Sequence, residues 1–264
     1  MNHRMDPSLE KYYSEGNEKD RLSALRLEKD RTLRILEKQL PSPPAILLDV
    51  GGAAGVYAFP LAEMGYEVHL IDPIPLHIKQ AKERAKNEGR ALKSYAVGDA
   101  RKIEWKDSSA DAVLFFGPLY HLIARQDRLA ALSEAYRVLK PGGLLFAAGI
   151  ARAASLMDAM HKGKVYSKLK VIEEELATGV HRKISEDMTF AYLHRPNELK
   201  EELETSGFNH VSIRAIEGPV WEKRVIEELQ GQKDWEKLLA ILEKIETEES
   251  IIGASAHIMA IGQR

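Results

Sequence analysis

Leucine residues recur every three or four positions among arginine, lysine and glutamate in the first part of the chain. This period predicts an amphipathic helix, so we expect helical structure over residues 8–40, with Ser8 as the first cap. Pro41, Pro43 and Pro44 follow directly and end it, because proline lacks the backbone N–H that a helix requires.

From residue 45 onwards, short apolar runs alternate with helical segments. Such runs predict strands that are buried on both faces, as in a parallel sheet covered by helices. The expected strands are Ala45–Val50, Tyr66–Asp72, Leu92–Val97, Asp111–Phe116, Leu144–Ile150, Phe208–Ile216 and Ser255–Ile261. The expected helices are Val56–Met64, Leu76–Glu88, Arg128–Lys140 and Pro196–Ser206. The alternation predicts a doubly wound α/β fold.

Two stretches interrupt this alternation. Residues 151–194 are rich in lysine and glutamate with helically spaced apolar residues, and residues 221–249 carry a second amphipathic pattern. The apolar stripe of the second stretch can pack on the sheet or on a second subunit. A monomer and a homodimer are therefore both open.

Composition narrows the partners and the chemistry. The chain has 264 residues, of which 44% are hydrophobic and 30% charged, as in a globular protein. Its net charge of −2 gives no overall basic field, so we expect neither nucleic acid nor a membrane as a partner. The absence of cysteine excludes disulfides and thiolate chemistry. The polar first residues lack a signal-peptide core and no stretch is apolar enough to span a membrane, so we expect a cytoplasmic location.

A glycine-rich turn follows the first expected strand, in the run A-I-L-L-D-V-G-G-A-A-G-V-Y at residues 45–57. Glycine lets the backbone approach a ligand closely, so a strand, a glycine turn and a helix predict a nucleotide-binding unit. A dinucleotide fingerprint needs glycine at the first, third and sixth positions of the turn, and neither Gly51 nor Gly52 starts such a register. The spacing therefore disfavours an NAD-dependent dehydrogenase.

Acidic residues end or follow the next two strands. Asp72 ends the second expected strand, 21 residues beyond Gly51, where an acid is placed to accept hydrogen bonds from ribose hydroxyls. The alternative is that Asp72 caps the next helix, with Pro73 beside it. Asp99 follows the third expected strand, and by itself it would be a plain turn residue.

Several motifs together resemble one family. The turn reads Asp49-x-Gly51-x-Ala53-x-Gly55, which is similar to the D-x-G-x-G-x-G turn of class I S-adenosylmethionine-dependent methyltransferases, with alanine in place of the middle glycine. The run R-V-L-K-P-G-G at residues 137–143 is similar to a second signature of that family. The segment Y-Y-S-E-G-N-E-K-D-R-L at residues 12–22 resembles the N-terminal cap of its small-molecule members.

The resemblance implies a mostly parallel seven-stranded sheet with an antiparallel last strand. It also implies S-adenosyl-L-methionine as cofactor and S-adenosyl-L-homocysteine as product. In the family the glycine turn contacts the methionine and ribose parts, an acid after the third strand contacts the adenine, and an aromatic and a basic residue of the cap close over the ligand. The cofactor-binding residues implied here are Tyr13, Arg21, Asp49, Gly51, Gly52, Ala53, Gly55, Asp72, Pro73, Asp99, Ala100, Phe116 and Gly117.

The transfer of a methyl group needs mainly the alignment of an acceptor with that group. A general base is required only if the acceptor must lose a proton, and Tyr120, His121 and His194 are the candidates, with a structural role as the alternative for each. The segment Gly117–His121 differs from the Asn-Pro-Pro-Tyr arrangement of enzymes that methylate amides of bases or glutamine. The nine histidines show no metal-binding spacing, so no metal is expected.

We expect one methyltransferase domain over residues 1–264. Its expected parts are a helical cap at residues 1–40, a cofactor-binding half at 41–150, a lid insertion at 151–195, and the rest of the sheet at 196–264 with a helical insertion at 221–249. The expected function is S-adenosylmethionine-dependent methyl transfer to a small-molecule acceptor by in-line displacement. The alternative is a protein that binds the cofactor without transferring the methyl group, such as a sensor or a degenerate partner subunit.

Overall fold

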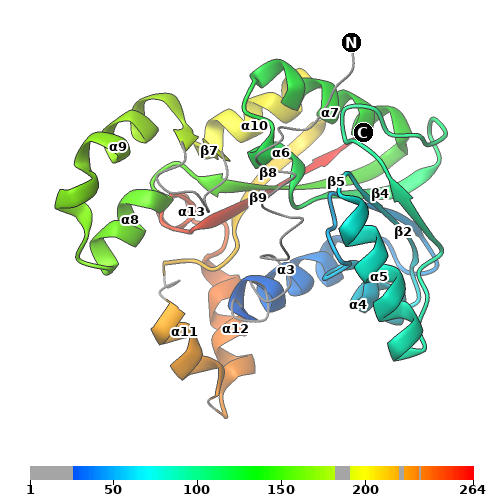
Figure 1. Ribbon diagram of the computed structural model, residues 1–264, viewed down its shortest axis with the longest axis horizontal. Helices are drawn as coiled ribbons and strands as arrows, with labels where there is room; N and C mark the ends of the chain where they lie inside the picture. The colour runs from blue at the N-terminus through cyan, green and yellow to red at the C-terminus, as the bar shows by residue number, and fades with distance from the viewer. Residues whose placement is uncertain (1–25, 182–190, 220–222, 232) are drawn as a thin grey trace.

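A central sheet runs through the molecule and helices lie on both of its faces (Figure 1). The computed structural model describes residues 26–181, 191–219, 223–231 and 233–264. The strands are β1 (Ile46–Val50), β2 (Glu67–Asp72), β3 (Ser94–Val97), β4 (Ala110–Phe115), β5 (Leu139–Ala151), β6 (Val180–His181), β7 (Ala191–His194), β8 (Asn209–Ala215) and β9 (His257–Gln263). Strands β3, β2, β1, β4 and β5 are neighbours in that order and run parallel.

The pairings of β5 place the remaining strands. Strand β9 runs antiparallel to β5, and β8 pairs with the other edge of β9. Ile150 in β5 pairs with His257 of β9 and also with Leu193 of β7. Because a strand has only two edges, β7 must lie on the edge of β5 that β4 occupies further back. The short β6–β7 pair therefore lies beyond the carboxyl end of β4.

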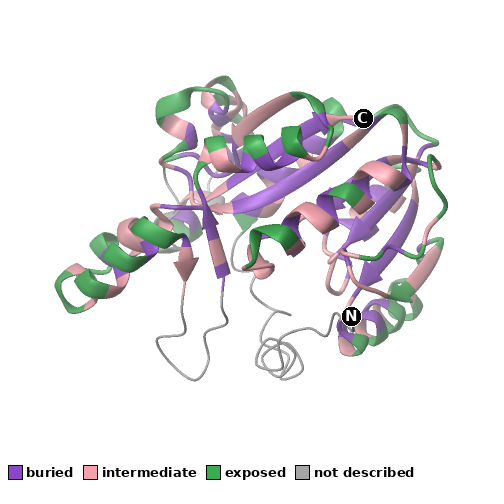
Figure 2. Ribbon diagram, turned by 90° about the horizontal axis from the view of Figure 1, so that it is seen from above, coloured by how far each residue is buried: buried purple, intermediate pink, exposed green. Residues whose placement is uncertain are grey.

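Helices bury each face of the sheet, whose strands are largely buried (Figure 2). Val113 and Leu114 are consecutive in β4 and point to opposite faces, and they belong to two separate apolar clusters. The described helices are α3 (Arg26–Gln39), α4 (Ala58–Glu63), α5 (Pro75–Glu88), α6 (Pro118–His121), α7 (Arg125–Val138), α8 (Ala154–His161), α9 (Val165–Thr178), α10 (Pro196–Thr205), α11 (Lys223–Gln230), α12 (Trp235–Ile245) and α13 (Glu249–Ile252). Residues of α3, α4 and α5 pack in the cluster with Leu114, and residues of α7 and α10 in the cluster with Val113.

The amphipathic stripe of the second insertion packs inside the chain. Ile226 of α11 and Trp235 and Leu239 of α12 form a small apolar cluster with Leu27 at the start of α3. The indole Nε1 of Trp235 donates a hydrogen bond to Asp30 of α3 at 2.8 Å. Contact with α3 therefore accounts for this stripe without a second subunit.

All seven expected strands are present and the mostly parallel fold is confirmed, but the sheet has nine strands in the described part of the chain, two more than expected. The additional pair, β6 and β7, arises inside the first insertion, where only helices were expected. Strand β6 has two residues, too few for an alternating pattern to reveal it.

The segment 140–143 also differs from expectation. It was expected to separate a helix ending at Lys140 from a strand beginning at Leu144, whereas β5 already begins at Leu139. The Nζ atom of Lys140 lies 2.7 Å from Asp111 at the start of β4, and the Gly142 N–H donates to the Arg264 carbonyl at 2.9 Å. Between these contacts the β4–β5 register shifts, from Ala110 opposite Leu139 to Ala112 opposite Leu144, so the strand passes through a local irregularity. None of the helices in the described part of the chain has the length and apolar character that a membrane crossing needs.

Candidate functional site

The backbone of the turn between β1 and α4 has a conformation that lets a ligand approach it closely. Gly51, Ala53 and Gly55 have φ angles of 74°, 48° and 82°, all in the left-handed region. Ala53 takes this conformation at a cost of about 1 kcal/mol, since its Cβ crowds the backbone there. The Gly51 N–H donates to the Ile71 carbonyl at 2.7 Å, which ties the turn to β2. The turn is thus held at the carboxyl ends of β1 and β2.

Asp49, in β1, lies against this turn with its side chain fully buried. Neither of its carboxylate oxygens has a hydrogen-bond partner in the described part of the chain. A Cβ atom added to Gly52 would lie 2.4 Å from Asp49 Oδ2, so glycine is needed there to leave room for the carboxylate. Burial, and to a smaller extent the charge of Asp72, raises the pKa of Asp49 to about 7, with the Ala58 backbone amide acting against both. A buried carboxylate of this kind is suited to a cationic or hydrogen-bonding ligand group.

Asp72 connects the turn to the start of α5. Its Oδ2 accepts a hydrogen bond from the Ala53 N–H at 2.8 Å, and its Oδ1 accepts one from the Ile74 N–H at 2.9 Å. Oδ1 also lies 2.9 Å from His77 Nδ1. The Ile74 contact is a local turn ahead of α5 and not the helix-capping role that the sequence left open, because Ile74 itself is the N-cap and has no side-chain capping hydrogen bond. A carboxylate has about four acceptor positions, so Oδ2 keeps capacity for a ribose hydroxyl.

The loop after β4 approaches the same turn. A Cβ added to Gly117 would lie 3.0 Å from the Gly51 carbonyl oxygen, and one added to Gly51 would lie 2.8 Å from Pro118 Cδ. The rings of Phe116 and Tyr57 pack edge to face with centroids 4.9 Å apart. The expected residues of β1 and β4 therefore do come together at one edge of the sheet.

The acid after β3 has a partner in the same loop. Asp99 forms a two-pronged ion pair with Arg101, with distances of 3.0 Å from Nε to Oδ1 and 2.7 Å from Nη2 to Oδ2. Ala100 between them is buried. The pair holds the Asp99 carboxylate in place at the carboxyl end of β3, and contact with an adenine amino group stays a prediction.

Two cap residues expected at the cofactor, Tyr13 and Arg21, lie outside the described residues. The others fit S-adenosylmethionine by their chemistry. The unpartnered carboxylate of Asp49 suits an ammonium group, and Asp72 Oδ2 suits a ribose hydroxyl. Gly51, Gly52 and Gly117 carry no side chains, so the loops after β1 and β4 offer their backbone to a ligand at the carboxyl edge of the sheet.

The three candidate bases lie in neighbouring elements, since α6 with Tyr120 and His121 packs against β7 with His194. The Tyr120 hydroxyl donates to the Phe116 carbonyl at 2.6 Å, and the rings of Tyr120 and His121 are 4.6 Å apart. His194 is fully buried, and its Nε2 lies 3.4 Å from Glu202 Oε2. Burial lowers the pKa of His194, with Glu202 opposing this effect. A ring without solvent access favours the structural alternative for His194.

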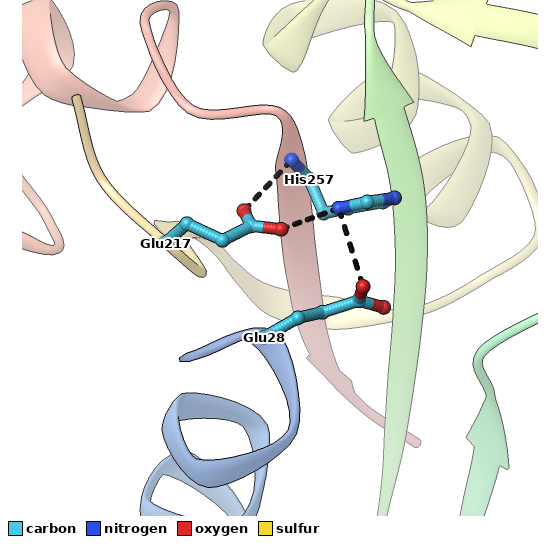
Figure 3. Close-up of side chains that lie close together, drawn as sticks. All are labelled: Glu28, Glu217 and His257. Carbon is cyan, nitrogen blue, oxygen red and sulfur yellow. Dashed lines mark hydrogen bonds and ion pairs between the residues drawn. The ribbon is translucent and has the colours of Figure 1, made fainter. Parts of the chain in front are cut away.

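A second group of titratable side chains occupies the same edge of the sheet (Figure 3). Glu217, just after β8, lies with Oε1 2.5 Å from His257 Nδ1 and accepts the His257 backbone N–H through Oε2 at 3.0 Å. Glu28, in the first turn of α3, lies 3.9 Å from the same Nδ1. Burial raises the pKa of Glu217, but the charge and hydrogen bonds of His257 outweigh it and hold that pKa below its ordinary value.

The ligand atoms of this group lie within 4.8 Å of one another, a spacing that could hold a metal ion. Glu217, however, is already satisfied, since Ser255 Oγ also donates to its Oε2 at 3.0 Å. A metal would have to break the contact between Glu217 and His257, so we interpret the group as a carboxylate–imidazole pair with a second carboxylate nearby. No local signal in the sequence predicts it, because its members come from three distant segments.

The fold and this edge define an α/β protein with a nucleotide-cofactor site. Residues 48–147 match the family model described as a methyltransferase domain. The chain is 32% identical over 111 residues to the uncharacterized methyltransferase YodH of Bacillus subtilis (42% of this chain, 46% of that one). It is 33% identical over 106 residues to a ubiquinone biosynthesis O-methyltransferase of Methylocella silvestris (40% of each). It is 29% identical over 210 residues to the ubiquinone/menaquinone biosynthesis C-methyltransferase UbiE of Nitrobacter hamburgensis (74% and 78%).

Solved structures show the same fold. An S-adenosylmethionine-dependent methyltransferase of Thermotoga maritima, a possible histamine N-methyltransferase, superposes with a TM-score of 0.61 at 19% identity, covering 97% of this chain and 98% of that one. Phosphoethanolamine N-methyltransferase 2 of Haemonchus contortus, in complex with S-adenosyl-L-methionine, superposes with a TM-score of 0.54 at 19% identity (89% and 52%). Residues 48–147 therefore match a methyltransferase domain, and the fold is that of class I S-adenosylmethionine-dependent methyltransferases, whose cofactor is S-adenosylmethionine. The chain spans less than half the length of the first curated relatives it matches.

Proposed function

We propose that this protein transfers the methyl group of S-adenosyl-L-methionine to a small organic acceptor. The observation that carries the proposal is the unpartnered, buried carboxylate of Asp49 beside Gly52, inside the segment that matches the methyltransferase model. Such a carboxylate is costly unless a ligand pairs with it. An amino-acid ammonium, as in the methionine part of the cofactor, is a matching partner.

The bound cofactor supplies an activated methyl group on a sulfonium, which leaves as the neutral thioether of S-adenosyl-L-homocysteine. The residues of the chain bind and orient. Asp49 neutralises the amino group, Asp72 accepts from the ribose, and Asp99 faces the adenine. Holding an acceptor in line with the methyl group supplies effective molarities of about 10⁵ M or more, so orientation can account for most of the rate.

If the methyl group is transferred to the oxygen of an O–H group or the nitrogen of an N–H group, the acceptor must lose that proton as the new O–C or N–C bond forms. Tyr120 and His121 on α6 are the candidates to receive it, because α6 follows the β4 loop at the cofactor edge. A base in this position contributes roughly 10²-fold or more. His194 is less suited because its side chain is buried.

The acceptor class rests on the relatives and on charge. Two of the three curated relatives named above are an O-methyltransferase of ubiquinone biosynthesis and a C-methyltransferase of ubiquinone/menaquinone biosynthesis. The net charge of −2 offers no track for a nucleic acid. The chain acts as a monomer or a homodimer in this proposal.

The test uses cofactor labelled in its methyl group, incubated with the protein and a panel of a catechol, a quinol and a primary amine, and with cell extract. We expect label in a low-molecular-weight product and release of S-adenosyl-L-homocysteine. Tight cofactor binding without any labelled product would instead favour the alternative, a protein that binds the cofactor and transfers nothing. Label in RNA or protein would contradict the proposed acceptor class.

A further inference from the structure

The insertion after β5 carries an exposed surface that the cofactor site does not use. Helices α8 and α9 pack against each other and project from the body of the molecule (Figures 1 and 2). On α9, Ile172 and Glu175 are buried and form its inner face, with Lys168 partly buried on the same side. Tyr166, Leu169 and Lys170 are exposed. The two helices meet at residues 160–165, the tip of this hairpin.

Large apolar side chains are exposed at this tip. Met160, Tyr166 and Leu169 are 62%, 87% and 52% exposed. They are three of the six exposed large hydrophobic residues in the described part of the chain, and they fall within ten consecutive positions. Scattered exposed residues of this kind are ordinary, whereas a local group marks an interaction surface.

The same tip is basic. No aspartate or glutamate occurs between Asp158 and Glu173, while lysine occupies positions 162, 164, 168 and 170. Lys162 pairs with Asp158 at 2.7 Å. Lys164, Lys168 and Lys170 form no ion pair with any residue that the structure describes. The local charge is therefore strongly positive although the whole chain carries −2.

We propose that this surface docks on an anionic lipid bilayer. We call Met160, Lys164, Tyr166, Lys168, Leu169 and Lys170 the tip patch. Apolar and aromatic side chains set among lysines are the composition of helices that lie in the membrane interface, where the rings and chains enter the headgroup region and the ammonium groups meet phosphate. A site for nucleic acid needs the cations but gains little from exposed Met160 and Leu169.

This proposal goes beyond the proposed function and does not depend on methyl transfer. It revises the expectation of no membrane partner, which rested on the charge of the whole chain. A bilayer responds to charge within about one Debye length, roughly 8–10 Å, so the lysines of the tip count, and Glu173 and Glu174, one turn beyond Lys170 on α9, offset part of their charge. Helix α8 follows β5 directly, so docking would hold the carboxyl edge of the sheet near the bilayer surface.

The experiment is cosedimentation of the full chain with vesicles of phosphatidylcholine, with and without phosphatidylglycerol. We expect binding to the anionic vesicles only, weakened by salt. The variant Lys164→Gln/Lys168→Gln/Lys170→Gln should bind the anionic vesicles roughly 100-fold more weakly. Each lysine near the surface contributes ~1 kcal/mol to membrane binding, and about 1.4 kcal/mol corresponds to a tenfold change in affinity. A second variant, Tyr166→Ser/Leu169→Ser, should weaken binding at high salt, where the apolar contribution remains.

The matched control is Lys79→Gln/Lys82→Gln/Lys86→Gln, which removes the same charge from exposed positions of α5. It should keep wild-type vesicle binding. All substituted side chains lie outside the apolar clusters, and circular dichroism checks the fold. Failure of the wild-type chain to bind anionic vesicles at low salt overturns the proposal. Equal losses in the α5 control, or binding to an RNA oligonucleotide in place of vesicles, overturn it as well.

Discussion

Gly52 and Asp49 are fitted to each other: a Cβ atom on Gly52 would come within 2.4 Å of the Asp49 carboxylate, which is buried and unpartnered in the described part of the chain. The glycine thus serves the acid rather than the bend of the turn, since its φ is not in the left-handed region. Gly52 falls on a variable position of the Asp49-x-Gly51-x-Ala53-x-Gly55 turn, so this steric contact, and not the signature, explains the glycine.

Gly52→Ala should therefore lower the free energy of unfolding by about 1–3 kcal/mol, the usual cost of overpacking, and should weaken cofactor binding. Denaturant unfolding and calorimetry with S-adenosyl-L-homocysteine measure the two effects. Gly253→Ala is the matched control, because a Cβ there meets no atom within 4 Å. In an Asp49→Ala background the clash is absent, so Gly52→Ala should lower the free energy of unfolding much less than it does in the wild-type background. Equal stability of Gly52→Ala and Gly253→Ala would contradict the steric argument.

The raised pKa of Asp49, about 7, predicts a pH dependence. The folded state holds this proton up to about pH 7, whereas an unfolded aspartate loses it near pH 4, so the stabilising contribution is complete in acid and is lost as pH rises through 7. Asp49→Asn cannot ionise, so its stability relative to wild type should increase between pH 5 and pH 8. Unfolding at both pH values tests this, with exposed Asp234→Asn as control. A difference that does not change with pH would show that Asp49 is not the titrating group.

Asp72→Ala should weaken cofactor binding by about 1.5–3 kcal/mol, the range for hydrogen bonds to a charged group. It should also destabilise the fold, since the Ala53 and Ile74 N–H groups lose their acceptor. His77→Gln is the control, because it alters the other contact of the same carboxylate and leaves Oδ2 in place. We expect His77→Gln to change stability but not affinity in calorimetry. Unchanged affinity in folded Asp72→Ala would remove the ribose role.

Glu217→Gln should lower the free energy of unfolding by about 1.5–3 kcal/mol at neutral pH, because the charged hydrogen bonds of the buried carboxylate with His257 and Ser255 are lost. The pKa of Glu217 is lowered in the folded state, so its stabilisation is present above the unfolded value near 4.5 and is lost as pH falls through the folded value. The difference in the free energy of unfolding between wild type and Glu217→Gln should therefore become smaller at acid pH. Exposed Glu249→Gln should show neither effect in the same unfolding series.

The cap expected at residues 1–40, with Tyr13 and Arg21, and the lid expected within residues 151–195 predict a change on cofactor binding. Closure over the ligand would exclude water and hold the acceptor in line. Hydrogen exchange with and without S-adenosyl-L-homocysteine should show new protection in residues 8–24 as well as around Gly51. Protection confined to the glycine turn would leave the cap without support.

The sequence by itself determined the order of strands and helices and the cofactor turn. The strand at Ile46–Val50 and the helix at Pro75–Glu88 were located to within a residue or so, because apolar periodicity and chain-breaking residues are local signals. The acid at Asp72 was found by its distance from Gly51, since one βα unit has a nearly constant length. Its contacts do not include the capping hydrogen bond of α5, and the ribose role stays a prediction.

Only the tertiary structure decided which distant groups meet. Glu28, Glu217 and His257 come together because α3 packs across the ends of β8 and β9, and no local pattern records that contact. The β6–β7 pair, the burial of His194 and the raised pKa of Asp49 are likewise products of packing. Local patterns specify backbone conformation, whereas solvent exclusion and the proximity of charges depend on every element that packs around a side chain.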